Sequence, residues 1–235
     1  MIKIEKASKM IDDKFIFKDI SLNVKKQETY LLVGPNGIGK TSLLKSIIGL
    51  YSIYSGSITV LGKKITKAYK MNPDIGVYLD TAKILPHSNV LESLSFFVSL
   101  YEKSIDDIHD LIYYLHLENE LNKTYMSLSS GNKRKLGLLI SLINNPELII
   151  WDEPFATLDP EMCSELVDFI FTLKRKGKTI LLTTNDLFFA DNLYDKIGFF
   201  VNTSELIEQT RETLIEKYPN KSLTDIYFLI KQSIV

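Results

Sequence analysis

The chain has 235 residues, of which 45% are apolar and 24% are charged, and its formal net charge at pH 7 is −1. These values indicate a globular protein with a sizeable core, and they argue against a disordered chain and against the basic excess typical of nucleic-acid-binding proteins. The single cysteine, Cys163, cannot form an internal disulfide, which favours a reducing compartment. No stretch of the sequence reaches the roughly 18 apolar residues of a transmembrane helix, so we expect any membrane span to belong to another chain.

The N-terminal part of the chain contains short strand-like segments. Residues 2–5, 15–17, 20–24 and 57–61 are rich in β-branched or aromatic side chains and are bounded by turn residues. This pattern predicts an antiparallel β layer joined by tight turns.

The rest of the chain alternates apolar runs with helical patterns. The runs predict strands at 29–33, 75–78, 148–151, 179–183 and 197–201, several of them apolar throughout, as in strands buried on both faces. The segments between them predict helices at 40–48, 90–101, 105–115, 132–143 and 160–176. This alternation predicts an α/β fold with a largely parallel central sheet.

We expect the chain to form one domain with three parts. A core covers about 1–79 and 146–205, and a mainly helical sub-domain covers about 80–145. A C-terminal extension covers about 206–235, where the sequence is first polar and then amphipathic.

A phosphate-binding loop follows the first strand of the predicted parallel sheet. Residues 34–41 read GPNGIGKT and match G-x-x-x-x-G-K-[ST], between a strand and a helix as that motif requires. The glycines let backbone N–H groups turn inward, and the following helix directs the positive end of its dipole at the phosphates. Lys40 supplies a positive charge, and the Thr41 hydroxyl can bind Mg²⁺. The predicted nucleotide contacts are Gly34, Pro35, Asn36, Gly37, Ile38, Gly39, Lys40, Thr41 and Ser42.

Two acidic residues, Asp152 and Glu153, follow the apolar strand at 148–151. At the carboxyl edge of a parallel sheet both side chains would face the ligand crevice. We expect Asp152 to hold Mg²⁺ through water and Glu153 to orient or polarise an attacking water.

A family resemblance rests on the region from Met126 onward. Residues 127–135 read SLSSGNKRK, residues 145–154 read NPELIIWDEP and residues 157–160 read TLDP. This order of motifs resembles the ABC ATPases over nearly the whole chain. The LSSGN string at 128–132 is similar to their LSGGQ signature, and LDP at 158–160 is similar to their D-loop.

The resemblance implies a composite site. In the family, two nucleotide-binding subunits meet head to tail, and the signature of one caps the ATP held by the P-loop of the other. Ser129, Ser130 and Gly131 would therefore contact the ATP of a second subunit. A helix N-terminus at this point suits an anion.

Three positions depart from the family pattern. Asn185 stands where a histidine usually contacts the γ-phosphate, and an amide cannot carry a proton. Asp80 stands for the Q-loop glutamine that senses Mg²⁺ and water, so the resemblance implies a metal contact here in addition to Thr41 and Asp152. This acidic residue resembles the E-loop of bacteriocin and lantibiotic immunity transporters. Ile11 stands for the aromatic residue that stacks on adenine, unless Phe15 reaches the base. Because Glu153 is intact, we expect ATP hydrolysis that is slow but real.

The resemblance implies the ATP-binding and ATP-hydrolysing subunit of an ABC transporter, with ATP and Mg²⁺ as its ligands. Its partners would be a second nucleotide-binding subunit, in a homodimer or heterodimer, and transmembrane permease subunits, with no nucleic acid. It would lie in the cytoplasm against the inner face of the cell membrane. The acidic Q-loop favours peptide export or antimicrobial-peptide immunity. The docking surface should lie around 80–89, where Ile84, Leu85 and Pro86 form either an exposed patch or part of the sub-domain core.

Two other functions remain open at this stage. A soluble ABC ATPase could act as a regulator that uses ATP mainly to dimerise, which the Asn185 replacement favours. A soluble ABC ATPase could also act on DNA or ribosomes, but the interval between Thr41 and Ser129 is too short for a long coiled coil, and the chain carries one module rather than two.

Overall fold

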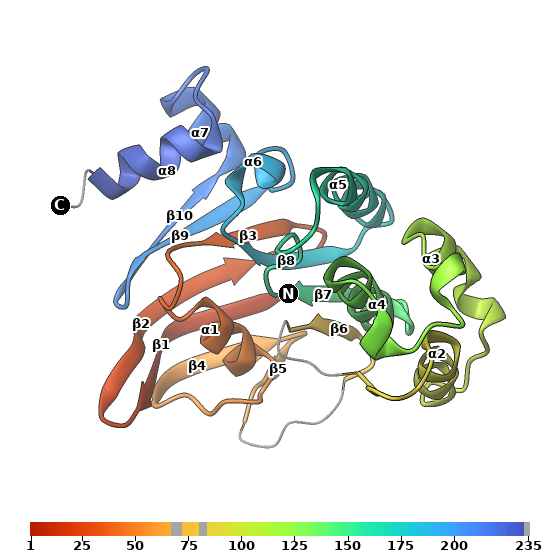
Figure 1. Ribbon diagram of the computed structural model, residues 1–235. Coiled ribbons are helices and arrows are strands. Elements are labelled where there is room, and N and C mark those ends of the chain that lie inside the picture. Colours follow the sequence, from red (N-terminus) through yellow and green to blue (C-terminus); the bar gives the residue numbers. More distant parts are fainter. Residues whose placement is uncertain (67–71, 80–83, 233–235) are drawn as a thin grey trace.

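The computed structural model describes residues 1–66, 72–79 and 84–232. Its described strands form two sheets, with strand orders β2-β1-β4-β5 and β10-β9-β3-β8-β7-β6 (Figure 1). The first sheet is the predicted antiparallel layer, and its strands are β1 (Ile2–Ile11), β2 (Lys14–Val24), β4 (Ser55–Val60) and β5 (Lys63–Lys64).

The prediction of separate strands at 15–17 and 20–24 is wrong, because both lie in the continuous strand β2. The register with β1 shifts between the pairs Ala7–Ile20 and Lys9–Phe17. Asp19 takes up the extra residue of this bulge with a φ of 53°, and its backbone N–H donates to Oγ of Ser8 at 2.9 Å.

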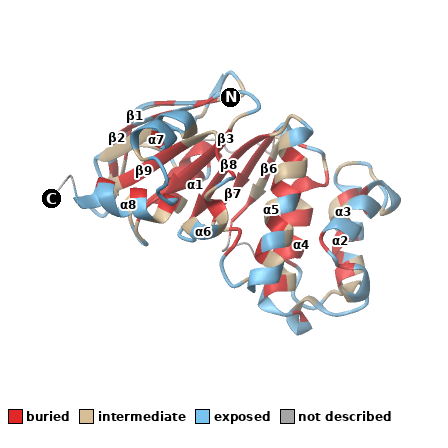
Figure 2. Cartoon of the chain, turned by 90° about the horizontal axis from the view of Figure 1, so that it is seen from above, coloured by how far each residue is buried: buried red, intermediate tan, exposed pale blue. Residues whose placement is uncertain are grey.

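The second sheet is parallel apart from its last strand. All five strands predicted for it are present, and β10 adds an antiparallel edge next to β9. Its strands are β3 (Thr29–Val33), β6 (Ile75–Tyr78), β7 (Leu148–Trp151), β8 (Thr179–Thr184), β9 (Lys196–Asn202) and β10 (Glu205–Thr210). Strands β3, β7 and β8 are buried along their whole length, although β3 contains one threonine and β8 contains three (Figure 2).

The helices are α1 (Lys40–Ile47), α2 (Val90–Ser99), α3 (His109–Tyr114), α4 (Ser130–Leu142), α5 (Pro160–Arg175), α6 (Leu187–Ala190), α7 (Arg211–Lys217) and α8 (Leu223–Gln232). The helix predicted over 105–115 is broken, because a 3₁₀ turn at Asp106–Ile108 precedes α3 and Ile108 leaves helical geometry with a φ of −118°. Among the described residues, no helix is long and apolar enough to cross a membrane.

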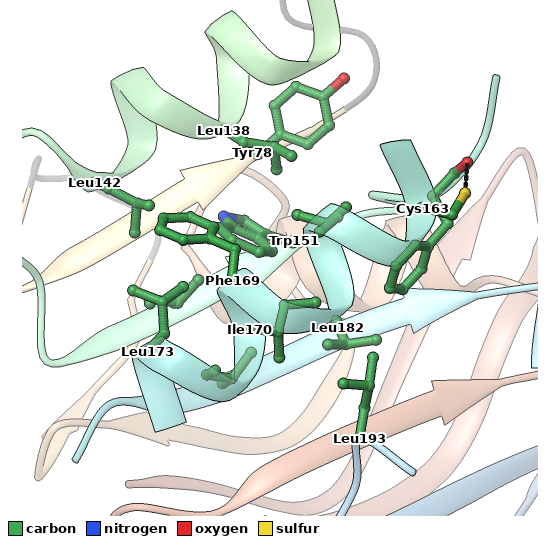
Figure 3. Close-up of a cluster of buried hydrophobic side chains, with 14 of the residues drawn as sticks. Tyr78, Leu138, Leu142, Trp151, Cys163, Phe169, Ile170, Leu173, Leu182 and Leu193 are labelled. Carbon is green, nitrogen blue, oxygen red and sulfur yellow. Dashed lines mark hydrogen bonds between the residues drawn. The ribbon is translucent and has the colours of Figure 1, made fainter. Parts of the chain in front are cut away.

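The core lies on both sides of the parallel sheet. Leu32, Ile150 and Leu181 pack with α1 and the antiparallel layer on one face. Ile149, Trp151 and Leu182 pack with α4 and α5 on the other. Figure 3 shows Trp151 and Leu182 among the side chains of this cluster. The Trp151 indole donates to Oγ of Ser141 at 2.9 Å. Buried residues of α2, α3 and α4 belong to this same second cluster. The helical segment between β6 and β7 thus shares its hydrophobic core with the sheet, and the tripartite division of the chain stays a prediction.

Candidate functional site

The loop between β3 and α1 has glycine where another side chain would not fit. A Cβ on Gly34 would lie 2.7 Å from the carbonyl oxygen of Phe200 in β9. Gly39 directly precedes α1 with a φ of 114°, and a Cβ there would lie 2.9 Å from the carbonyl oxygen of Ile16. The loop therefore lies tightly against β9 and the start of β2. No side chain caps the first turn of α1, and that turn contains no acidic residue. This arrangement fits an anionic ligand.

Lys40 lies at the centre of a group of predicted site residues. Its side chain is only 6% exposed. The ammonium donates to the carbonyl oxygen of Gly34 at 2.8 Å and to Oδ1 of Asn185 at 2.8 Å, and it lies 3.4 Å from Oε1 of Glu153. The three residues predicted to be catalytic, Lys40, Glu153 and Asn185, are thus in direct contact although they come from three separate segments of the chain.

The predicted metal ligands Thr41 and Asp152 are also neighbours. The Thr41 hydroxyl donates to Oδ2 of Asp152 at 2.7 Å, and the Thr183 hydroxyl donates to Oδ1 of the same carboxylate at 2.7 Å. Hydroxyl and carboxylate oxygens of this kind fit Mg²⁺, which is usually held by one or two protein oxygens together with substrate phosphates. Thr183 is a site residue that the sequence did not reveal, since threonine is common in strands.

The backbone and the carboxylate of Glu153 are both held in place. Its backbone has a φ of 50°, and its N–H donates to Oγ1 of Thr183 at 2.9 Å. Its Oε2 accepts a hydrogen bond of 3.0 Å from the backbone N–H of Asn185. Burial raises the pKa of the Glu153 carboxyl above its ordinary value, while the positive charge of Lys40 opposes this shift. A raised pKa suits a carboxylate that accepts a proton near neutral pH.

Asn185 connects the phosphate-binding loop to the acidic pair. Its Oδ1 accepts from Lys40, its backbone N–H donates to Glu153, and its Nδ2 donates to Oδ1 of Asn36. A cavity of about 240 Å³ adjoins this residue, and α8 supplies Tyr227 to its lining. Sequence reasoning missed Tyr227 because an aromatic residue in an amphipathic helix ordinarily predicts core packing.

The signature-like segment starts α4. Oγ of Ser129 accepts from the backbone N–H of Asn132 at 3.1 Å, so Ser129 is the N-cap of the helix. Ser129 and Ser130 are exposed, whereas Gly131 is buried and a Cβ there would lie 2.8 Å from Sδ of Met162 in α5. Among the described residues, no hydrogen bond joins these three residues to the loop at 34–42. Their exposed hydroxyls are open to a second subunit.

The predicted adenine contact is not aromatic. Ile11 ends β1 and is 42% exposed. Phe15 is the second residue of β2 and is 37% exposed. Its ring packs edge-on against that of Tyr54, with a distance of 6.1 Å between the ring centroids. Both side chains have surface available for a base.

The segment expected to form either a docking patch or part of the core is divided between the two. Ile84 is only 8% exposed and belongs to the hydrophobic cluster that contains Val90 and Leu94. Leu85 is 38% exposed, and Pro86 is also exposed. The isoleucine therefore anchors this segment to the core, while its two neighbours remain on the surface. Asp80 lies outside the described residues.

Comparisons with known proteins agree with this geometry. Residues 17–156 match the family model described as ABC transporter. The lantibiotic transport ATP-binding protein SrtF of Streptococcus pyogenes is 30% identical over 95% of this chain and 98% of its own length. The Nod factor export ATP-binding protein I of Burkholderia thailandensis is 30% identical over 96% of this chain and 76% of its own length.

The fold has close counterparts among solved structures. The ATP-binding subunit of an ABC transporter superimposes with a TM-score of 0.86 at 24% identity, covering 98% of this chain and 99% of that one. A dimeric ATP-binding cassette in a post-hydrolysis state, bound to ADP and Pi, superimposes with a TM-score of 0.80 at 21% identity, covering 89% and 98%. At these identities the similarity establishes the fold.

Proposed function

Because the chain belongs to the ABC transporter family of ATP-binding subunits, we propose that residues 34–42 bind ATP with Mg²⁺ and that Glu153 supports slow hydrolysis, which drives a separate membrane permease. The observation that carries this proposal is the direct contact of Lys40 with both Glu153 and Asn185. A buried cation, a carboxylate with a raised pKa and an amide are brought together beside a loop shaped for phosphate.

Each residue has a distinct role in this proposal. Lys40 and the backbone N–H groups of the loop bind the phosphates. Thr41 and Asp152 would hold Mg²⁺, which neutralises phosphate charge when it is bound. Thr183 fixes the orientation of the Asp152 carboxylate through its hydrogen bond to Oδ1. Glu153 positions a water molecule and accepts its proton.

The replacement at Asn185 accounts for the proposed slow rate. Its amide can donate or accept a hydrogen bond, and it keeps the contact to Lys40. Unlike histidine, it cannot take up a proton near neutral pH. Binding and alignment would therefore remain, while proton transfer would rely on Glu153 alone.

We further propose that the working unit contains two nucleotide-binding subunits. Ser129, Ser130 and Gly131 of one subunit would contact the ATP bound at Lys40 of the other. The exposure of both serine hydroxyls at the start of α4 supports this arrangement. The partner could be a second copy of this chain or a related chain.

The transport role is proposed as export of an amphipathic peptide. The support is the similarity to SrtF, a lantibiotic transport protein that the chain matches over nearly its full length. In this proposal the permease docks beside Leu85 and Pro86, which are exposed where Ile84 anchors the segment. The subunit would then lie on the inner face of the cell membrane.

The hydrolysis proposal is tested with the purified chain and Mg-ATP. We expect phosphate release above that of an E153Q control, with both proteins binding ATP. Equal release by the two would reject hydrolysis at this site, and ATP-dependent dimerisation without hydrolysis would then favour the regulator that uses ATP mainly to dimerise.

The transport proposal requires a test in cells. We expect the tagged chain to co-purify with a membrane protein encoded beside it, and we expect its deletion to increase killing by cationic amphipathic peptides. Wild-type survival across a panel of such peptides, in a strain that lacks the chain, would exclude peptide export as its role.

A further inference from the structure

Arg134 extends from α4, the helix that follows the signature-like segment, to the backbone of Glu153. It lies in the second turn of α4 and is only 5% exposed. Its Nη1 donates to the carbonyl oxygen of Glu153 at 2.8 Å and also to the carbonyl oxygen of Ala156. One guanidinium nitrogen therefore joins both ends of the turn that follows β7.

This turn has backbone that needs support. Glu153 has a φ of 50° and Thr157 has a φ of 63°, both in the left-handed region that residues other than glycine rarely adopt. Such conformations persist where the surrounding structure holds them in place. The two hydrogen bonds from Arg134 hold Glu153 itself and Ala156, which directly precedes Thr157.

Arg134 also contacts the end of the neighbouring strand β6. Its guanidinium carbon lies 6.0 Å from the centroid of the Tyr78 ring. One turn further along α4, a Cβ on Gly137 would lie 2.4 Å from Cε2 of the same ring, so Tyr78 packs closely on the helix surface. The carbonyl oxygen of Tyr78 accepts from the backbone N–H of Asp152 at 2.9 Å. Arg134 thus contacts both the end of β6 and the turn that follows the acidic pair.

The neighbouring cation provides a natural comparison. Lys133 is on the same helix as Arg134, and both residues line a cavity of about 420 Å³. Its ammonium donates to the carbonyl oxygen of Met126 at 3.2 Å and lies 5.6 Å from the centroid of the Tyr125 ring. These contacts face the start of α4 rather than Glu153. Both residues carry a positive charge. Arg134 donates hydrogen bonds to the acidic turn, whereas Lys133 donates to Met126.

We propose that Arg134 is a positioning residue for hydrolysis: it holds the backbone of Glu153 so that the carboxylate meets the attacking water, and it connects that backbone to α4, the helix capped by Ser129. The inference rests on the proposed hydrolytic function. A displacement of about 1 Å in a reacting group can cost roughly a hundredfold in rate. Arg134 would act on the rate of the chemical step, because its contacts are to Glu153 and Ala156 rather than to the loop that binds phosphate.

The test compares R134A, R134K and K133A with the wild type and E153Q, each as the full chain. We expect kcat for R134A to fall roughly 10- to 100-fold while KM for ATP and the affinity for ATP change less than about twofold. R134K keeps a donor without the guanidinium fork, so its kcat should be intermediate. K133A should resemble the wild type. Methylguanidinium should restore part of the kcat of R134A, since loss of the side chain would leave space for a small cation next to the cavity of about 420 Å³ that Arg134 lines.

Four outcomes would overturn the inference. One is wild-type kcat in folded R134A, and another is a parallel loss of kcat and ATP affinity. The third is an R134A protein that fails to fold together with an R134K protein of wild-type kcat, because Arg134 would then serve folding alone. If the wild type releases no more phosphate than E153Q, the proposed hydrolysis is rejected and the role of Arg134 with it. Active wild type with unchanged R134A rejects only the role of Arg134.

Discussion

The hydroxyl of Thr41 donates a 2.7 Å hydrogen bond to Oδ2 of Asp152, which joins the start of α1 to the end of β7. The contact brings together two predicted oxygen ligands of Mg²⁺ from positions far apart in the sequence. Its partner bond from Thr183 holds the other carboxylate oxygen. Asp152 is only 3% exposed, so its two side-chain oxygens are held by threonine hydroxyls rather than by bulk water.

Substitution of Thr41 tests the metal role of this pair. We expect T41A to lose roughly 10- to 100-fold in Mg²⁺-dependent ATP affinity, the range typical for disturbed metal sites. T41S keeps the hydroxyl and should stay within a few-fold of the wild type. The measurement is ATP binding with Mg²⁺ and with EDTA. An equal loss under both conditions would assign Thr41 to phosphate binding instead.

Restoring a histidine at Asn185 tests the proposed cause of slow turnover. The side chain contacts Lys40 and Asn36, so position 185 faces the phosphate-binding loop. We expect N185H to raise kcat by about tenfold or more, since a positioned proton carrier contributes roughly 100- to 10,000-fold in other enzymes. N185A removes both side-chain contacts and should lower kcat. Steady-state phosphate release gives kcat for the wild type, N185H and N185A. A kcat for N185H at or below that of the wild type would show that Asn185 does not limit the rate.

The sequence was sufficient for features that depend on local chemistry. The loop at 34–41 needs glycine, lysine and threonine at fixed spacing, and the strand at 148–151 is marked by its apolar run. Both lie where they were predicted. The contact between Lys40 and Glu153 follows from topology, since the carboxyl ends of parallel strands share one edge of the sheet.

Features that depend on tertiary contacts were missed. Nothing local distinguishes Thr183 from other strand threonines, and its role appears only when β8 lies beside β7. Arg134 lies between two lysines, and arginine is mostly exposed in folded proteins, yet its side chain is buried against the acidic turn. The sequence predicts two strands, at 15–17 and 20–24, joined by a tight turn, whereas the contact of Asp19 with Ser8 keeps β2 continuous around a bulge.

The raised pKa of Glu153 predicts a pH dependence of both rate and stability. Its carboxylate must be ionised to accept a proton, so the rate should fall as pH drops through the raised pKa. The raised value also means that the folded protein binds this proton more tightly than the unfolded chain does. The stabilisation from the protonated form is therefore complete below the ordinary value of 4.5 and is lost as pH rises through the folded pKa.

Substitution of Glu153 by glutamine separates these effects. E153Q should be inactive, and near neutral pH without nucleotide its melting temperature should equal or exceed that of the wild type, because burial no longer penalises a charge. The advantage should vanish below the ordinary pKa of 4.5. Melting curves across the acidic range measure this difference. A lower melting temperature for E153Q near neutral pH would contradict the predicted sign.

The thiol of Cys163 should be unreactive in the folded protein. It is 2% exposed, and burial raises its pKa to about 11. At pH 8 roughly one molecule in a thousand would carry a thiolate, the form that reacts. A chromogenic disulfide reagent should therefore detect no rapid reaction in the native state and one thiol per chain after unfolding. Rapid native reaction would show that α5 opens readily near its N-terminus.

Substitution of Ile11 by an aromatic residue tests whether this position contacts adenine. Stacking of a base on an aromatic ring contributes ~1–3 kcal/mol, which corresponds to roughly 5- to 150-fold in affinity. If Ile11 is the side chain that faces adenine, I11Y should bind ATP more tightly by an amount in this range. F15A should then leave affinity nearly unchanged, since the Phe15 ring already packs against Tyr54.

The ATP affinities of I11Y and F15A should show the opposite pattern if Phe15, rather than residue 11, contacts adenine. If Phe15 stacks on the base, F15A should weaken ATP binding by the same 5- to 150-fold range, and I11Y should gain little because the base face is already covered. Binding of ATP and of ribose triphosphate, measured in parallel, separates base contacts from phosphate contacts. No change in either variant would place adenine away from the turn between β1 and β2, and would leave the phosphate-binding loop to supply most of the affinity.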